Sequence, residues 1–253
     1  AISATTESNF NKLLISNIRY SQMLWSWCSA NKVPFIYASS AATYGNGENG
    51  YDDNENLLSK LIPLNAYGYS KHFFDQWVYS QINSNQPSPP QWCGLKFFNV
   101  YGPNEYHKNR MASVVFHAFQ QFQKEKEIRL FKSENPDYKD GMQLRDFIYV
   151  KDAVEYVMYF LKNSHISGLF NSGTGVAQSF RDLAEAVIKN TDGNKSNIKY
   201  INMPDDLKGK YQYYTEANLD KIKAKGLNLK FKNLKEGVND YMQNYLLTSD
   251  RYA

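Results

Sequence analysis

Tyr67 and Lys71 stand four residues apart in the run Tyr67-Gly68-Tyr69-Ser70-Lys71, inside a segment with helical apolar spacing. Side chains four apart share one face of a helix. A free tyrosine has a pKa of about 10, and a nearby ammonium favours the phenolate. The spacing therefore predicts that Tyr67 transfers a proton near neutral pH, although a surface Tyr beside a surface Lys would give the same pattern.

Ser40 favours the catalytic interpretation, because Ser39-Ser40 follows a dense apolar run over 33–38 that predicts a buried parallel strand. Ligands of open α/β sheets bind at the carboxyl ends of the strands. We therefore expect Ser40 to hydrogen-bond the reacting oxygen and Lys71 to reach a cofactor ribose. A nicotinamide would then accept the hydride.

The elements that must position these residues alternate along the chain. Helical spacing occurs over 11–30, 66–82, 111–124, 179–190 and 233–246, and Asp152 is expected to cap a further helix that runs to about Leu161. Further strands are expected over Gly94–Val100, Asp146–Val150 and Leu169–Asn171, with loops over 45–65, 83–91 and 132–144. Strands alternating with helices predict an α/β fold, with a parallel sheet flanked by helices.

Composition narrows the class. The chain has 253 residues, of which 42% are apolar and 21% charged, and its net charge is +4. This charge does not by itself argue for a nucleic-acid surface, and no apolar run reaches the length of a membrane span, so we expect neither nucleic acid nor membrane as a partner. Cys28 and Cys93 stand alone in apolar stretches, which predicts buried thiols in a reducing compartment.

The run Gly45-Asn46-Gly47-Glu48-Asn49-Gly50 matches the G-x-G-x-x-G string of dinucleotide-binding loops. A functional loop of this kind must leave a strand and open a helix. Acidic residues follow here without helical apolar spacing, so we interpret the run as a surface loop. No metal-ligand spacing is present among the four histidines.

Three motifs resemble the extended short-chain dehydrogenase/reductases: the runs Tyr37–Gly45, Tyr67–Lys71 and Phe98–Pro103. Within that superfamily the chain is similar to the ADP-L-glycero-D-manno-heptose 6-epimerases, from Ala1 to about Tyr241. The stretches that favour this group are Ser39–Gly45, His107-Lys108, Met111–Val114, Arg145–Phe147 and Leu207–Gln212.

The resemblance implies a Rossmann-type domain for NADP and a smaller α/β substrate-binding domain. The expected bounds are 1–105 and 146–176 for the first domain, and 106–145 and 177–253 for the second. The first strands and the Gly-rich loop of the family are expected to precede Ala1, and a chain that begins without them, at Ala-Ile-Ser, is expected to be cut.

The activity implied is a C6 epimerisation that converts ADP-D-glycero-D-manno-heptose to ADP-L-glycero-D-manno-heptose. Members of the group oxidise the heptose carbon and reduce it again with tightly bound NADP, and NAD is a possible alternative here. The resemblance also implies a cytoplasmic homo-oligomer that supplies heptose for the inner core of lipopolysaccharide.

The resemblance assigns roles residue by residue. Tyr67 and Lys108 become the two acid/base groups, with Ser40 and Lys71 in support. The cofactor residues implied are Ala1, Ile2, Ser3, Asn17, Lys71, Val100 and Lys108. The substrate residues implied are Asn99, Arg110, His117, Phe131, Lys132, Ser133, Glu134, Arg145 and Tyr211.

The chain departs from the group at two positions: Lys96 replaces a usual Arg, and Arg110 stands where a small hydroxyl residue is common. Without the family, Lys108 would be a solvated charge and His117 a packed histidine. Arg145 would be part of a structural ion pair, although its fork also suits a diphosphate. Tyr211 fits either a core or a stack on adenine.

Two alternative functions stay open. One is another nucleotide-sugar 4-epimerase or dehydratase of the same superfamily, although Ser40-Ala41-Ala42-Thr43 offers no carboxylate for an elimination. The other is a non-catalytic relative that binds a nucleotide or an RNA. The joint presence of Ser40, Tyr67, Lys71 and Lys108 argues against this second alternative.

Overall fold

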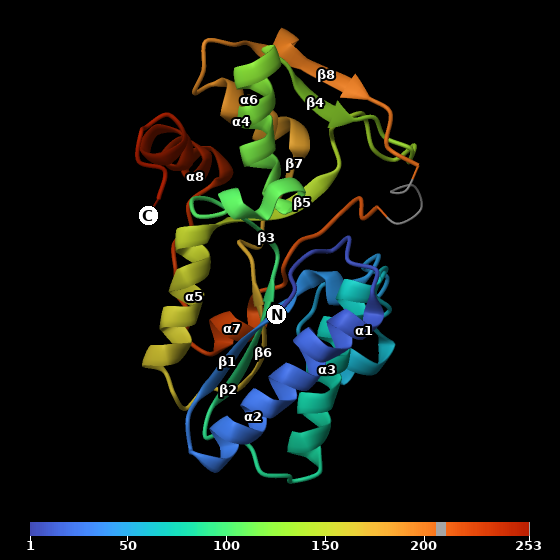
Figure 1. The fold of residues 1–253 in the computed structure, drawn as a ribbon, viewed down its shortest axis with the longest axis vertical. Helices are drawn as coiled ribbons and strands as arrows, with labels where there is room; N and C mark the ends of the chain where they lie inside the picture. The colour runs from blue at the N-terminus through green and yellow to red at the C-terminus, as the bar shows by residue number, and fades with distance from the viewer. Residues whose placement is uncertain (206–210, 253) are drawn as a thin grey trace. The chain divides into compact units, whose positions relative to one another are not determined.

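The computed structural model describes residues 1–205 and 211–252 (Figure 1). The chain forms two compact units. Unit 1 comprises Ala1–Phe98, Glu155–Ser172 and Ala217–Leu229, and unit 2 comprises Asn99–Val154, Gly173–Glu216 and Lys230–Ala253. The functional division into a cofactor domain and a substrate domain stays a prediction.

Unit 1 is built on a parallel sheet in the order β1-β2-β6, with β1 over Phe35–Ser40, β2 over Trp92–Phe97 and β6 over Gly168–Ser172. Its register aligns Ser40 with Phe97 and Phe97 with Ser172, so the three carboxyl ends lie at one edge. The α- and π-helices that belong to unit 1 are α1 (Phe10–Leu13), the π-helical η1 (Leu14–Arg19), α2 (Tyr20–Ala30), α3 (Ala66–Asn83), α7 (Asp220–Ala224) and most of α5 (Val150–Lys162). The predicted α/β class with a parallel sheet is confirmed.

An aromatic cluster packs α2 and α3 onto this sheet. Trp25 of α2 is 1% exposed and makes edge contacts with Phe35 of β1 and Trp77 of α3, both at 6.0 Å between ring centroids. Cys28 and Cys93 are buried, as expected from their apolar surroundings. Helix α3 begins where the sequence predicts, because the side chain of Asn65 accepts a hydrogen bond from Gly68 N–H at 2.8 Å.

Unit 2 holds a three-stranded sheet in the order β3-β5-β7 and a separate parallel pair of β4 and β8. The strands are β3 (Asn99–Tyr101), β4 (Ile128–Phe131), β5 (Leu144–Tyr149), β7 (Ala177–Ser179) and β8 (Ile198–Ile201). The helices are α4 (Val114–Glu125), α6 (Phe180–Ile188), α8 (Leu234–Tyr241) and the π-helical η6 (Met242–Leu246). Phe122, Tyr149 and Tyr241 lie in one buried cluster of this unit.

Some expectations about the elements are wrong. The single strand expected over Gly94–Val100 is two strands in two sheets, interrupted at Phe98, whose N–H donates to Ser172 O at 3.1 Å. Asp152 lies inside the first turn of α5 and is not its cap, since the helix begins at Val150. The loop expected over 45–65 contains a 3₁₀ turn, η3 (Glu55–Lys60). Within residues 1–205 and 211–252, no helix combines the length and apolar character needed to span a bilayer.

Candidate active site

Ser40 ends β1 and caps the turn that follows it. Its Oγ accepts a hydrogen bond from Ala42 N–H at 3.1 Å, which starts the 3₁₀ turn η2 (Ala41–Tyr44). The turn closes at Gly45, which has a φ of 60° and a backbone so close to Ile62 that a Cβ would lie 1.9 Å from the Ile62 carbonyl oxygen. Only glycine fits there, and the Ser40 turn is therefore fixed at the carboxyl edge of the sheet.

Gly68 brings α3 against this turn. A Cβ on Gly68 would lie 2.8 Å from Ala42 O and 2.9 Å from Pro63 Cβ, so any larger residue would push the first turn of α3 away. The close approach places Tyr67 in a buried position, 7% exposed, where the Ser40 side chain is near enough to lower the pKa of Tyr67. The structure thus brings together Ser40 and Tyr67, as the sequence predicts.

Lys71 lies on the same face of α3, with Nζ 5.9 Å from the centroid of the Tyr67 ring. The ammonium donates a hydrogen bond to Ala38 O at 2.8 Å. Burial lowers the pKa of Lys71, and the negative charge of Asp75 raises it in part.

The expectation that Lys71 lowers the pKa of Tyr67 is wrong for this arrangement. Burial raises the pKa of Tyr67 above its ordinary value, and the polar side chain of Ser40 lowers it only in part. The physical reason is that the ammonium faces a backbone carbonyl and the tyrosine ring, while desolvation disfavours the phenolate.

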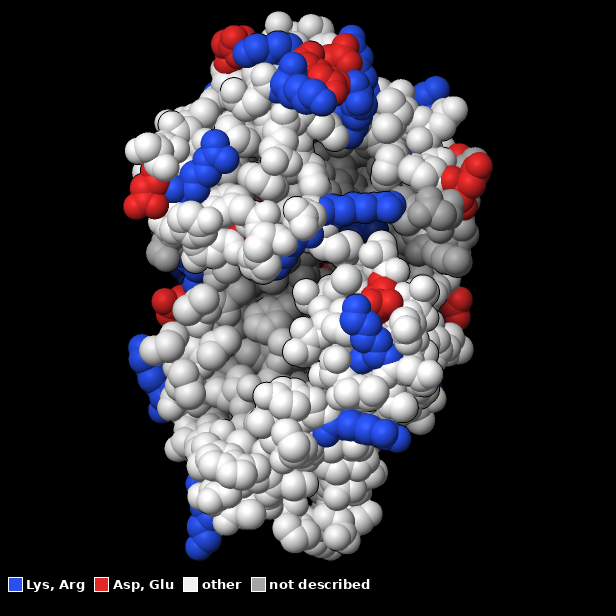
Figure 2. All heavy atoms as spheres, viewed as in Figure 1, with Lys and Arg blue, Asp and Glu red and all other residues white. Residues whose placement is uncertain are grey.

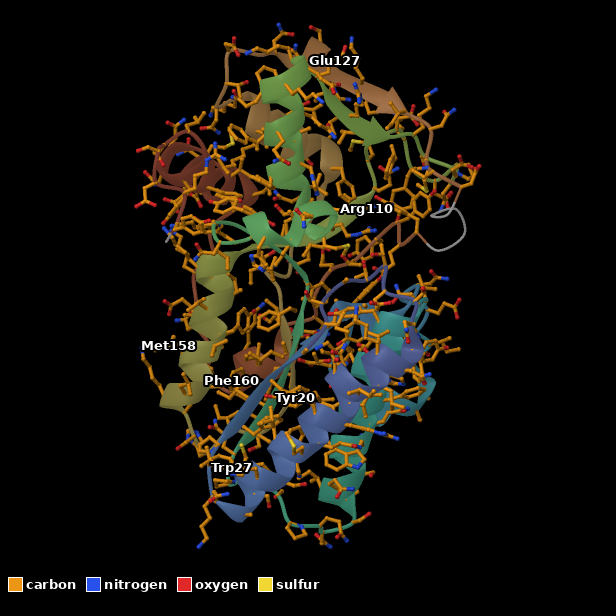
Figure 3. All side chains as sticks on the ribbon, in the orientation of Figure 1. Tyr20, Trp27, Arg110, Glu127, Met158 and Phe160 are labelled. Carbon is orange, nitrogen blue, oxygen red and sulfur yellow. The ribbon has the colours of Figure 1, made fainter. Side chains whose placement is uncertain are left out.

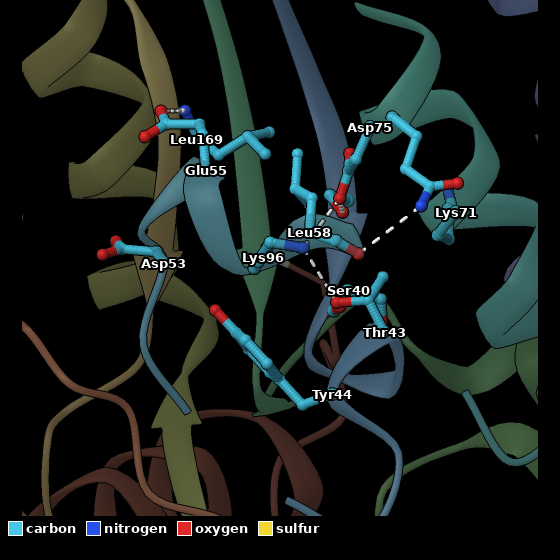
Figure 4. A network of polar contacts seen from close by, with 12 residues as sticks. Ser40, Thr43, Tyr44, Asp53, Glu55, Leu58, Lys71, Asp75, Lys96 and Leu169 are labelled. Carbon is cyan, nitrogen blue, oxygen red and sulfur yellow. Dashed lines mark hydrogen bonds and ion pairs between the residues drawn. The ribbon is translucent and has the colours of Figure 1, made fainter. Parts of the chain in front are cut away.

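A network of buried polar side chains connects the elements that carry the site (Figure 4). Lys96 of β2 and Asp75 of α3 form an ion pair of 2.8 Å, with side chains 1% and 0% exposed. Lys96 also donates to Thr43 Oγ1 at 2.8 Å, and Thr43 Oγ1 donates to Ser40 O at 2.9 Å. The pair therefore links the Ser40 turn to the helix that carries Lys71.

Asp75 is not among the site residues predicted from sequence, although its spacing from Lys71 could have identified it. It follows Lys71 by four residues and so continues the Tyr67–Lys71 face of α3. Its carboxylate also accepts hydrogen bonds from Ser39 Oγ at 2.6 Å and Tyr37 Oη at 3.0 Å. A carboxylate at this position of the helix, facing a strand that contains a buried lysine, predicts an ion pair between Asp75 and Lys96.

The expected cofactor residues at the start of the chain are held by Asn17. Its Oδ1 accepts from Ile2 N–H at 2.6 Å, and its Nδ2 donates to Ile2 O at 3.0 Å and to Ser70 Oγ at 2.9 Å. Both backbone polar groups of Ile2 are thereby paired with a side chain. Asn17 ties this segment to α3, beside Tyr67.

The carboxyl end of β6 also carries a buried hydroxyl group. Ser172 Oγ at the end of β6 is buried and has no hydrogen-bond partner among the described residues. A buried polar group without a partner is unusual in a folded protein. Together with Ser40 and Lys71, it fits the edge of a parallel sheet at which a nucleotide cofactor binds.

In unit 2, Lys108 and Arg110 lie in a 3₁₀ segment, η4 (Tyr106–Met111), that follows β3. Figure 3 labels Arg110 on this segment. Both residues are exposed. His117 on α4 has a ring nitrogen 3.3 Å from Arg110 O. Asn99 and Val100 are half-buried on β3.

Three expected substrate residues form a second cluster in unit 2. The Arg145 guanidinium is buried and lies 5.1 Å from the centroid of the Tyr211 ring and 5.6 Å from that of Phe180. Tyr211 contacts Phe131 edge-on at 6.4 Å. Arg145 donates to Leu144 O and Gln212 O, so backbone carbonyls and aromatic rings help to hold it.

The loop after β4 lines a hollow of about 700 Å³. Ser133 and Glu134 line it together with Arg181 and Tyr200, and Lys132 precedes them with its N–H bonded to Ile201 O at 2.8 Å. Of the distinguishing stretch Leu207–Gln212, residues 207–210 lie outside the described part of the chain.

The glycine run is not a dinucleotide loop. Gly45, Gly47 and Gly50 all have positive φ, and turns closed by Gly47 N–H to Tyr44 O and Gly50 N–H to Gly47 O follow one another. No helix opens behind them, since the next helical element among the described residues is the 3₁₀ turn η3. The interpretation as a surface loop is confirmed.

Comparison with known proteins agrees with this geometry. A model of the "NAD dependent epimerase/dehydratase family" matches residues 2–173. A curated protein of Fusobacterium nucleatum, named ADP-L-glycero-D-manno-heptose-6-epimerase, is 50% identical over 260 residues, which cover 100% of this chain and 77% of that protein. A protein of the same name from Nitratidesulfovibrio vulgaris is 47% identical over 252 residues, which cover 100% of this chain and 76% of that protein.

Solved structures give the same picture. The ADP-L-glycero-D-manno-heptose-6-epimerase of Helicobacter pylori aligns with a TM-score of 0.78 and 28% identity, over 96% of this chain and 69% of its own. The UDP-glucose 4-epimerase of Thermus thermophilus, in complex with NAD, aligns with a TM-score of 0.71 and 21% identity, over 95% of this chain and 75% of its own. The second likeness shows a shared fold alone.

Proposed function

The chain belongs to the NAD dependent epimerase/dehydratase family, and we propose that it inverts C6 of the heptose in ADP-D-glycero-D-manno-heptose to give ADP-L-glycero-D-manno-heptose. The observation that carries this proposal is 50% identity, over the whole chain, to a curated protein named for that epimerisation. The placement of Ser40 near the buried Tyr67, and the Lys71 ammonium 5.9 Å from the centroid of the Tyr67 ring, support proton transfer at an alcohol.

The cofactor of this reaction is a nicotinamide dinucleotide, NADP or NAD. The family description and the NAD complex of the Thermus thermophilus enzyme support it. When bound, the cofactor supplies the hydride acceptor and donor. Ile2, Asn17 and Lys71 are proposed to hold it at the carboxyl edge of the sheet in unit 1, with Ala1, Ser3, Val100 and Lys108 as further contacts.

The proposed mechanism uses two proton-transferring groups. Tyr67 Oη takes the proton of the C6 hydroxyl as the carbon is oxidised, and Ser40 holds the same oxygen. Inversion requires that the flat ketone be reduced from its other face, where Lys108 Nζ gives a proton to the C6 oxygen. Burial of Tyr67 opposes its ionisation, so a positive charge must assist it when substrate is present, and Lys71 is the ammonium within reach.

The ADP-sugar is proposed to bind through unit 2. Arg145 offers a planar guanidinium suited to a diphosphate, and the rings of Tyr211 and Phe131 beside it suit the adenine. The other proposed contacts are Asn99, Arg110, His117, Lys132, Ser133 and Glu134.

A homo-oligomer is proposed from the surface of α2 and α3. Tyr20, Met23, Trp27 and Phe73 are 49%, 58%, 56% and 41% exposed. The sequence of α2 contains no charged residue, and Figures 2 and 3 show this largely uncharged face, with Tyr20 and Trp27 on it. Exposed apolar surface depleted in charge is typical of protein interfaces.

Light scattering of the purified protein tests the oligomer. We expect a multiple of the chain mass and a fall toward the single-chain mass for Trp27→Glu. An unchanged oligomer mass in that variant would show that Trp27 is not part of the interface.

A substrate panel tests the function. The enzyme with bound cofactor is incubated with ADP-D-glycero-D-manno-heptose, UDP-glucose or dTDP-glucose, and products are identified by NMR. We expect a C6 epimer from the first sugar alone. Formation of UDP-galactose or of a dehydrated dTDP-sugar as the main product would replace the proposal with a 4-epimerase or a dehydratase.

A further inference from the structure

A buried carboxylate joins the two ends of the loop that carries Lys108. This loop, Gly102–Ser113, contains Glu105, which is only 5% exposed although most of its neighbours up to Arg110 are exposed. Glu105 Oε1 accepts hydrogen bonds from Ser113 Oγ at 2.7 Å, Tyr241 Oη at 3.1 Å and Gly102 N–H at 3.4 Å. Its other oxygen, Oε2, accepts the N–H of Ser113.

These four donors come from three places. Gly102 and Ser113 are the first and last residues of the loop, and Tyr241 is fully buried on α8. A carboxylate only accepts hydrogen bonds, so it satisfies all four donors at once, and such charge-assisted bonds are stronger than neutral ones. Glu105 thus fixes both loop ends to a helix in the core of unit 2.

The backbone of this loop determines where Lys108 lies. Its own N–H donates to Glu105 O at 3.0 Å, while its side chain is exposed. The next residue, Asn109, has φ 49° and ψ −124°, a sharp reversal that redirects the chain after Lys108. A shift at the loop ends would therefore move the Lys108 ammonium.

We propose that Glu105 is the positioning residue of Lys108, holding its loop by joining Gly102 and Ser113 to Tyr241. This inference rests on the acid/base role proposed for Lys108. It predicts that a change at Glu105 affects one half of the epimerisation, the half in which Lys108 transfers the proton, and spares the half served by Tyr67.

The test measures each half-reaction separately. Each C6 epimer of the ADP-heptose is mixed with the enzyme that carries oxidised cofactor, and reduction of the nicotinamide is followed in a single turnover. Lys108→Met should slow one epimer selectively. Glu105→Gln should slow the same epimer by about 10²-fold, the effect expected for a misplacement near 1 Å, because an amide cannot accept all four donors.

A matched control comes from α6 of the same unit. Asp182 accepts hydrogen bonds from the N–H and Oγ of Ser179 at 3.1 Å and 2.6 Å, as Glu105 does from Ser113. Asp182→Asn therefore removes the same kind of helix cap without touching the Lys108 loop. We expect it to leave both half-reactions unchanged. If Glu105→Gln does not fold, Tyr241→Phe takes its place in the test, because it removes a single donor to Glu105. We then expect a smaller reduction in rate, for the same epimer.

Coupling between the two residues completes the test. If Glu105 acts through Lys108, the double variant Glu105→Gln/Lys108→Met is no slower than Lys108→Met alone. Equal slowing of both epimers by Glu105→Gln, or additive losses in the double variant, would overturn the inference and leave Lys108 in its proposed role. If Lys108→Met slows neither epimer, the inference falls together with that role.

Discussion

Asp53 is a buried carboxyl whose ionisation opposes folding, so the stability of Asp53→Asn relative to the unsubstituted protein should increase as the pH rises. The side chain is 2% exposed and accepts a hydrogen bond from Asn171 N–H at 2.7 Å. Burial raises the pKa of Asp53 to about 6, against the hydrogen bond from Asn171 and the charge of Lys221, which lower it. Because the folded protein binds this proton more tightly than the unfolded chain, ionisation destabilises the fold as the pH rises.

The magnitude follows from the two pKa values. Taking 3.8 for the unfolded chain and about 6 for the fold, the destabilisation reaches about 3 kcal/mol at pH 8 and is about 1 kcal/mol at pH 4.5. The unfolding free energy of Asp53→Asn relative to the unsubstituted protein should therefore rise by about 2 kcal/mol between those two pH values. This difference does not depend on any fixed, pH-independent contribution of the new amide.

Urea unfolding of both proteins at a series of pH values measures this difference. Asp192→Asn is the matched control, because a hydrogen bond from Lys126 lowers the pKa of that exposed carboxyl and the sign of the pH dependence should reverse. A relative stability of Asp53→Asn that stays flat or falls as the pH rises would refute the reasoning.

Three further predictions concern the site. Tyr67→Phe should lower turnover by orders of magnitude while thermal unfolding stays close to that of the parent, since a single hydroxyl is lost; normal turnover would remove Tyr67 from the mechanism. Gly68→Ala should lower the unfolding free energy by about 1–3 kcal/mol and slow turnover, because its methyl would meet Ala42 O at 2.8 Å. Lys96→Met should cost about 3–5 kcal/mol in urea unfolding, as it leaves Asp75 buried without its cation; a loss below about 1 kcal/mol would show that this ion pair is not needed for stability.

The parts of the site that local sequence determines could be predicted. The 66–82 helix and the Tyr67–Lys71 face follow from spacing within a single element, and Ser40 follows from the end of an apolar run. The Gly45 run could be excluded as a dinucleotide loop on its local context alone. Each of these features depends on residues close together in sequence.

The parts that depend on distant residues could not be predicted. The break at Phe98 depends on pairing with β6, and β4 pairs with β8 across 70 positions, from Ile128 to Ile198. The direction of the Tyr67 pKa shift depends on where the Lys71 ammonium points and on burial, neither of which spacing reveals. The role of Glu105 could not be predicted, because its hydrogen-bond partner Tyr241 lies far away in the sequence.

The central claim is that C6 is inverted by transient oxidation and re-reduction at one cofactor. ADP-D-glycero-D-manno-heptose that carries deuterium at C6 tests it most directly, with the enzyme and its bound cofactor in ordinary water and the product analysed by NMR and mass spectrometry. The account predicts an L-glycero product that retains deuterium at C6, because the hydride that leaves the carbon is the one that returns. Replacement of that deuterium by solvent hydrogen during epimerisation would show that C6 is inverted by proton removal, and would contradict the account.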